Sequence, residues 1–108
     1  MGMPRAKRVQ TIDTYKNFKT GAKTSVGTSA VQISTTSFKT KKGVLVKALS
    51  SNGTAIIYVG GSTVTALTDA TSGIELAASE WVVVEVNDVS DVYVIGSTTG
   101  LGVTWIIV

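Results

Sequence analysis

Short segments that alternate apolar and polar residues recur about every ten residues from residue 30 to residue 108. Gly, Asn and Ser separate these segments, and such spacing is typical of an antiparallel β-sandwich or barrel. We expect strands at 30–33, 44–49, 56–59, 73–76, 81–86, 92–95 and 102–108, with a short β-like stretch at 62–67. The pattern therefore predicts an all-β fold, a small antiparallel β-sandwich of jelly-roll or immunoglobulin-like type.

Residues 43–61 form the most regular part of this pattern. Two runs of β-forming residues flank Ser51, Asn52 and Gly53, and an Asn-Gly pair readily adopts the positive φ angles of a tight hairpin turn. We therefore expect a β-hairpin here, at the centre of the domain.

Several of the expected strands are apolar on both faces, which a two-layer sandwich cannot fully bury. The clearest neighbouring pairs are Val44/Leu45, Ile56/Ile57, Val83/Val84 and Ile106/Ile107. Either the second face packs on the arm or loops of the same chain, or it forms a subunit interface. The interface is favoured slightly, and it suggests a homo-oligomer.

The charges are strongly segregated along the chain. All ten basic residues lie before residue 48 with one acid, giving +9, and six acids follow with no base, giving −6. Residues 1–27 also carry few large apolar side chains. We therefore expect an extended basic N-terminal arm over 1–27, with a short helical turn near 13–19, and a β-sandwich domain over 28–108.

The expected arm combines cations with a few apolar side chains. Its candidate partner-binding residues are Arg5, Lys7, Arg8, Ile12, Tyr15, Lys16, Phe18, Lys19 and Lys23. The cations suit phosphates, and Tyr15 and Phe18 suit base stacking, so nucleic acid is one partner. An acidic protein surface is the favoured alternative because no base-reading element accompanies the arm. A disordered tail without a role is the third interpretation.

The residue types argue against most catalytic and metal chemistry. The chain has no Cys and no His, which removes thiolate zinc sites, disulfides and the commonest catalytic base. Glu80, Asp88 and Asp91 fall in expected turns, where a solvated carboxylate is far commoner than a catalytic pair. Asn87, Asp88 and Asp91 offer too few oxygens for a dedicated calcium loop. We therefore expect no enzyme activity, no metal and no cofactor.

No segment is long enough to cross a membrane as a helix, and the basic N terminus leads into no apolar signal segment. The chain is therefore expected to be made inside the cell, with no membrane partner.

Residues 42–108 resemble a small β-domain found in virion proteins of tailed bacteriophages. The residues that carry the resemblance are Lys47-Ala48-Leu49, Asn52-Gly53, Ile57-Tyr58-Val59-Gly60-Gly61-Ser62-Thr63-Val64-Thr65, Gly73, Leu76, Glu80, Val84-Glu85-Val86, Asp88, Ser90, Val92-Tyr93-Val94-Ile95-Gly96, Gly100, Val103 and Trp105. Relatives often have Pro-Gly before the acidic residue, where this chain has Ala78-Ser79. The resemblance does not extend to the arm.

This resemblance implies a structural virion protein made in the host cytoplasm. Such domains serve as head decoration (cement) proteins, as head fibres, and as parts of tail or baseplate proteins. The first expectation is a decoration protein on the capsid surface that binds the major capsid protein through its arm, as a trimer around a capsid three-fold axis. The alternatives are a tail, baseplate or fibre module that binds host glycan or another virion protein, and a nucleic-acid-binding protein.

Overall fold

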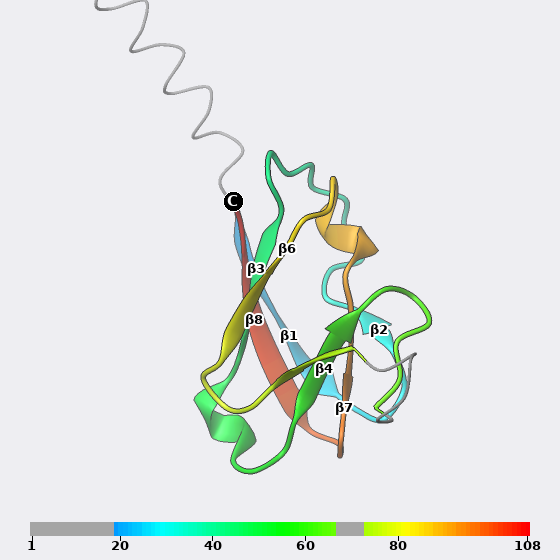
Figure 1. Cartoon of the computed structure of the whole chain (residues 1–108), viewed down its shortest axis with the longest axis vertical. Helices are drawn as coiled ribbons and strands as arrows, with labels where there is room; N and C mark the ends of the chain where they lie inside the picture. The colour runs from blue at the N-terminus through cyan, green and yellow to red at the C-terminus, as the bar shows by residue number, and fades with distance from the viewer. Residues whose placement is uncertain (1–18, 67–72) are drawn as a thin grey trace, which may run out of the picture.

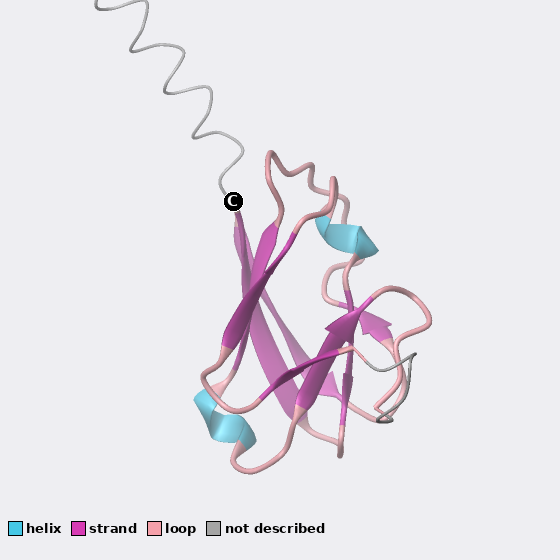
Figure 2. Cartoon of the chain, viewed as in Figure 1, coloured by secondary structure: helices cyan, strands magenta, loops and turns pink. Residues whose placement is uncertain are grey.

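The computed structural model describes residues 19–66 and 73–108, which form two four-stranded antiparallel sheets packed face to face (Figure 1). Sheet A has the strand order β1-β8-β3-β6, and sheet B has the order β2-β7-β4-β5. Two 3-10 turns, η1 and η2, lie in connections between strands (Figure 2). The elements are β1 (Thr20–Val26), β2 (Val31–Gln32), β3 (Val44–Ala48), η1 (Ser50–Asn52), β4 (Ile57–Gly60), β5 (Ile74–Leu76), β6 (Trp81–Val84), η2 (Val89–Asp91), β7 (Tyr93–Gly96) and β8 (Leu101–Ile107). The expected all-β sandwich is confirmed.

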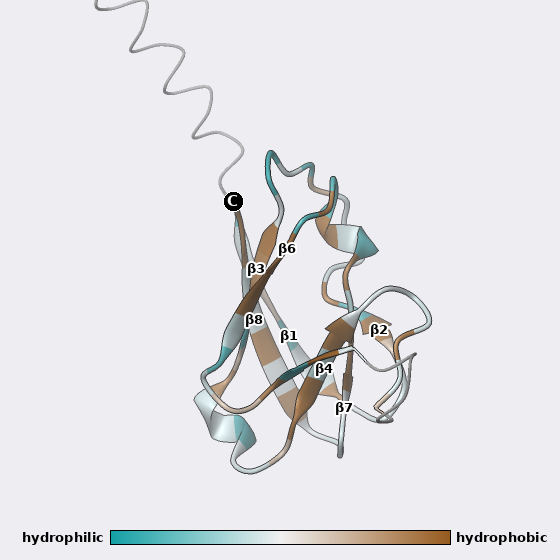
Figure 3. Ribbon diagram, in the orientation of Figure 1, coloured by the Kyte–Doolittle hydropathy of each residue, from teal (hydrophilic) through white to brown (hydrophobic). Residues whose placement is uncertain are grey.

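The core fills the space between the two sheets, and the apolar residues are concentrated on the strands (Figure 3). Removing each of these side chains from water contributes about 1.5–3 kcal/mol, so the alternation of apolar positions determines which face of each strand turns inward. The completely buried members are Val26, Val44, Val46, Ala48, Ile57, Val89, Val92, Val94 and Val103.

The alternation expected for the last strand is confirmed by the burial of β8. Val103, Trp105 and Ile107 are buried on its inner face, while Thr104 and Ile106 are half-buried on the other. β6 behaves in the same way, with Trp81 and Val83 exposed on its outer face.

The expected central hairpin is wrong, because β3 and β4 lie in different sheets. β3 pairs with β8 on one side and β6 on the other, which leaves no free edge for β4. Asn52, expected in the turn, is instead buried, and its side chain bonds to both the N–H and the C=O of Gly102. Gly53 alone has the expected positive φ, 68°. Residues 49–56 therefore cross from one sheet to the other.

The expected boundary between arm and domain also needs correction, because residues 20–26 form β1 and pair with β8. Val26 is completely buried, and Gly21 lies against the indole ring of Trp105, where a Cβ atom would collide. β1 therefore belongs to the sandwich, which begins about eight residues earlier than expected. The helical turn expected near 13–19 falls almost wholly outside the described residues.

Most connections carry the chain from one sheet to the other. β4 and β5 are the consecutive strands of the described sandwich that pair with each other. The expected stretch at 62–67 is a turn followed by a single bridge residue, Thr65, and residue 67 lies outside the described residues. The sandwich is consequently held together by pairings between segments that are distant in sequence.

Candidate interaction surface

The candidate arm residues divide into two groups. Lys19 and Lys23 belong to the sandwich: Lys23 lies in β1 opposite Val103, and the Lys19 backbone oxygen accepts a hydrogen bond from Ile107 N–H. The Lys19 ammonium lies 5.0 Å from the centroid of the Phe38 ring, a cation–π contact. The other candidates lie outside the described residues, and they are Arg5, Lys7, Arg8, Ile12, Tyr15, Lys16 and Phe18.

Asp88 is the carboxylate most deeply embedded in the described structure, and it has a structural role. It accepts hydrogen bonds from the Ser37 hydroxyl, from the backbone N–H of Phe38 and from both the N–H and hydroxyl of Ser90. The Lys39 Nζ atom lies 3.7 Å from Asp88 Oδ2, within ion-pair distance. These bonds, that from Ser37 foremost, hold the pKa of the Asp88 carboxyl well below its usual range. Asp88 thereby caps η2 and ties it to residues 37–39.

The other carboxylates do not gather around a common centre in the described part of the chain. Glu80 accepts a hydrogen bond from Ala77 N–H at 2.8 Å and so closes the turn between β5 and β6. Within residues 19–66 and 73–108, no group of three acidic or other ligating side chains is placed to hold a metal ion. The helices of these same residues include none that is long and apolar enough to span a bilayer.

Sheet B has its outer apolar face covered by the chain itself. Tyr58 and Ile95 oppose each other on this face, and Val64, from the segment after β4, packs on them. All three side chains are buried, with Ile56 and Tyr93 at their margin. The first explanation for strands that are apolar on both faces, coverage by a loop of the same chain, therefore holds for sheet B.

Sheet A differs, because no described segment covers its outer face. The pairing register aligns Val83 on β6 with Leu45 on β3, and Leu45 with Ile106 on β8, in one apolar row across three strands. Lys47 and Trp81 form the neighbouring pair. Val83 is 41% exposed and Trp81 is 60% exposed. Lys47 is also exposed, whereas Leu45 and Ile106 are half-buried. We call the set Leu45, Lys47, Trp81, Val83 and Ile106 the outer A face.

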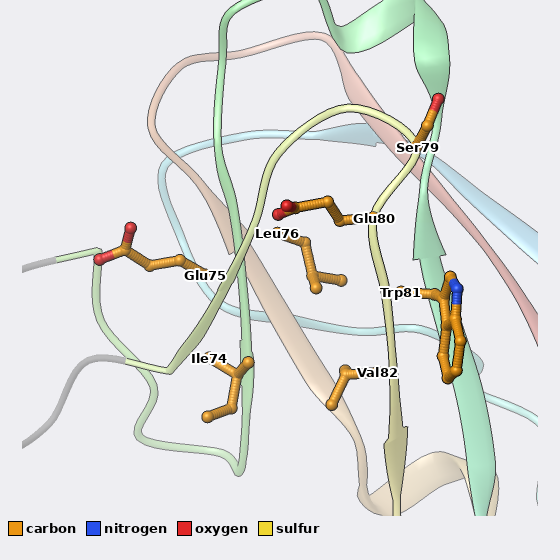
Figure 4. Close-up of a pocket in the computed structure, with 7 residues that line it drawn as sticks. All are labelled: Ile74, Glu75, Leu76, Ser79, Glu80, Trp81 and Val82. Carbon is orange, nitrogen blue, oxygen red and sulfur yellow. The ribbon is translucent and has the colours of Figure 1, made fainter.

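A groove adjoins the outer A face where the edges of the two sheets meet. It has a volume of about 470 Å³ and is lined by residues 74–76 of β5 and 79–82 of the turn and β6. Leu76 and Val82 lie between the two chain segments, whereas Trp81 lies beyond β6, near β3 (Figure 4). Ile74, on the β5 side, is 58% exposed. Large apolar side chains are therefore exposed along both rims of this open side.

Comparison of the chain with protein-family models, with curated proteins and with solved structures finds no match. The exposed surface is therefore the structural observation from which a function is inferred. Sequence reasoning anticipated the second apolar face through pairs such as Val83/Val84, but it did not single out Trp81 or the side of the sandwich where β5 and β6 meet. The sequence alone does not show that β5 and β6 are edge strands, because this depends on the order of the strands in each sheet.

Proposed function

We propose that the protein is a structural virion subunit, a capsid decoration or cement protein of a tailed phage that binds the major capsid protein and stabilises the head. The observation that carries the proposal is the outer A face, an apolar sheet surface left uncovered by the described chain while sheet B covers its own. A rigid sandwich with an exposed apolar face is suited to binding a protein surface. The resemblance of residues 42–108 to phage virion β-domains supports the same role.

The basic segment before β1 provides the second element of the proposal. Arg5, Lys7, Arg8 and Lys16 complement acidic groups on the partner, and Ile12, Tyr15 and Phe18 supply apolar anchors. An acidic, partly apolar surface of the capsid lattice suits both kinds of residue. In this arrangement the segment attaches the sandwich to the head and leaves the sheets outside the shell.

The copy number of the protein in purified virions tests this role directly. A decoration protein occurs in hundreds of copies, in fixed proportion to the major capsid protein, and quantitative mass spectrometry of virion peptides measures that ratio. Heads that lack the protein should also rupture at a lower temperature. A handful of copies assigns the protein to the tail, baseplate or a fibre instead, and its absence from virions contradicts the proposal.

A further inference from the structure

Four strands of the described sandwich lie at sheet edges, β1 and β6 in sheet A and β2 and β5 in sheet B. Edge strands expose unpaired N–H and C=O groups, and proteins protect them by short length, charge or an irregular backbone. β2 has two residues, and β5 has three with Glu75 at its centre. β1 carries Lys23, a register shift between Lys23 and Val26, and Ser25 with a positive φ of 58°. Three of the four edges are thus protected.

β6 is longer than β2 and β5, and it lacks the charge and the irregular backbone that protect the other edges. Its sequence is Trp-Val-Val-Val, without charge, proline or a register shift against β3. The backbone N–H of Ala48 donates to the backbone oxygen of Glu80 at 2.9 Å. Because backbone groups of successive strand residues point to opposite sides, Val82 and Val84 also direct their N–H and C=O groups toward β3. By alternation, Trp81 and Val83 direct their backbone N–H and C=O groups to the free edge. An unprotected, apolar edge of this kind favours pairing with another strand.

We propose that β6 pairs antiparallel with β6 of a second copy of this chain, about a two-fold axis at Val83. Opposed residues then lie on the same face of the joined sheet, as antiparallel pairing requires. Val83 opposes its counterpart, and Trp81 opposes Glu85 of the second copy. The two A sheets become one eight-stranded sheet, and their outer A faces become continuous. This inference does not rest on the proposed role in the virion.

Charge complementarity supports this register. Lys47 is the direct neighbour of Trp81 on β3, and both lie on the outer A face. Pairing at Val83 therefore places Trp81 between Lys47 and Glu85 of the second copy, and the two-fold axis creates this arrangement twice. Lys47 and Glu85 form no ion pair with any described residue of their own chain. The alternative register centred on Val82 would place Val83, not Glu85, opposite Trp81.

The proposed assembly is a closed dimer rather than the trimer expected from the sequence. Antiparallel pairing of identical strands requires a two-fold axis, and it uses the free edge of β6 in both copies. The three protected edges remain, so no further copy is added by the same contact.

Sedimentation equilibrium of the full chain over a range of concentrations tests the proposal. We expect a monomer–dimer equilibrium. Glu85→Lys and Lys47→Glu should each raise the dimer dissociation constant roughly tenfold, because each reversal replaces two exposed attractions by repulsions. The double reversal should restore most of the lost affinity. Val83→Lys, which places charges together at the axis, should leave a monomer.

Ile74→Lys provides the matched control, because Ile74 is a similarly exposed apolar residue on the other edge of the same groove. It should leave the dissociation constant unchanged, and circular dichroism should show that all variants remain folded. A strict monomer at high concentration, a trimeric mass, or a dimer that survives Val83→Lys would overturn the proposal. Failure of the double reversal to restore affinity would overturn the proposed register.

Discussion

Asn52 illustrates how one side chain joins distant parts of the sequence at the residue scale. Its Nδ2 donates to the Gly102 oxygen and its Oδ1 accepts from the Gly102 N–H, both at 3.0 Å. Asn52→Ala would leave the buried Gly102 N–H without an acceptor, which costs about 1–3 kcal/mol. We expect the free energy of unfolding to fall by that amount in urea titrations. Ser51→Ala, at the exposed preceding position, should change it little, and an equal loss in both variants would contradict the assigned role of Asn52.

The lowered pKa of the Asp88 carboxyl predicts how the stability of the sandwich depends on pH. Because folding lowers the pKa of this carboxyl, its stabilising contribution is present above the ordinary carboxyl pKa of about 4 and is lost as the pH falls toward the folded value. Asp88→Asn should therefore lower the melting temperature at neutral pH and flatten its decline below about pH 4. Melting curves at a series of pH values measure this effect. Asp91→Asn, at an exposed site in the same turn, should keep the slope of the unaltered protein.

At the scale of elements, the presence of β1 predicts different outcomes for two N-terminal truncations that differ by nine residues. Deletion of residues 1–18 should leave both sheets complete, because β1 begins at Thr20. Deletion of residues 1–27 removes β1, leaves the backbone groups on that edge of β8 unpaired and empties the position of Val26. We expect the shorter deletion to unfold cooperatively and the longer one to lose its β-type circular dichroism signal. A cooperative transition in the longer deletion would show that β1 is dispensable.

Strands whose own apolar side chains fill the core could be predicted from the sequence. β1 could not, because part of its inner face is formed by a glycine rather than by an apolar side chain. β8 and β6 alternate visibly, so their buried faces could be assigned beforehand. β1 reads TGAKTSV, and its inner position Gly21 provides space for Trp105 instead of an apolar side chain. That arrangement is encoded in two residues far apart in sequence, and no local pattern reports it.

Strand pairing could not be derived from local pattern for a related reason. β3 and β4 are both apolar and flank an Asn-Gly pair, yet β3 already has two partners in its own sheet. Likewise, the presence of a second apolar face could be predicted from neighbours such as Leu45 and Ile106. Its position, exposed on sheet A and covered on sheet B, depends on where Val64 packs after the chain turns.

At the scale of the whole molecule, the proposed attachment to the capsid depends on more than charge. Ordering each residue of an extended segment costs about 1–2 kcal/mol, whereas an exposed ion pair contributes about 0–1 kcal/mol. Tyr15→Ala combined with Phe18→Ala should therefore abolish co-sedimentation with capsid shells. Single Lys→Ala changes, at Lys7 or Lys16, should mainly increase the sensitivity of binding to salt.

The opposite result of these binding measurements would contradict the role of Tyr15 and Phe18 as apolar anchors. If the double aromatic variant attaches normally and charge reversal at Lys7 and Lys16 releases it, electrostatic attraction alone holds the protein on the shell. The variant with residues 1–18 deleted serves as the baseline for both measurements, because we expect its sandwich to be folded.

The position of β8 has a consequence for how the protein is made. β8 lies between β1 and β3, yet it is the last strand of the sandwich to leave the ribosome. Until residues 101–107 emerge from the exit tunnel, β1 has no neighbour in its sheet and β3 lacks one of its two. The nascent chain must therefore hold the apolar strands of sheet A incompletely paired until β8 has emerged, and during this interval they are available to chaperones and to other nascent chains. Final assembly of sheet A therefore waits for β8, and the first and last strands of the sandwich meet only after every strand between them has been made.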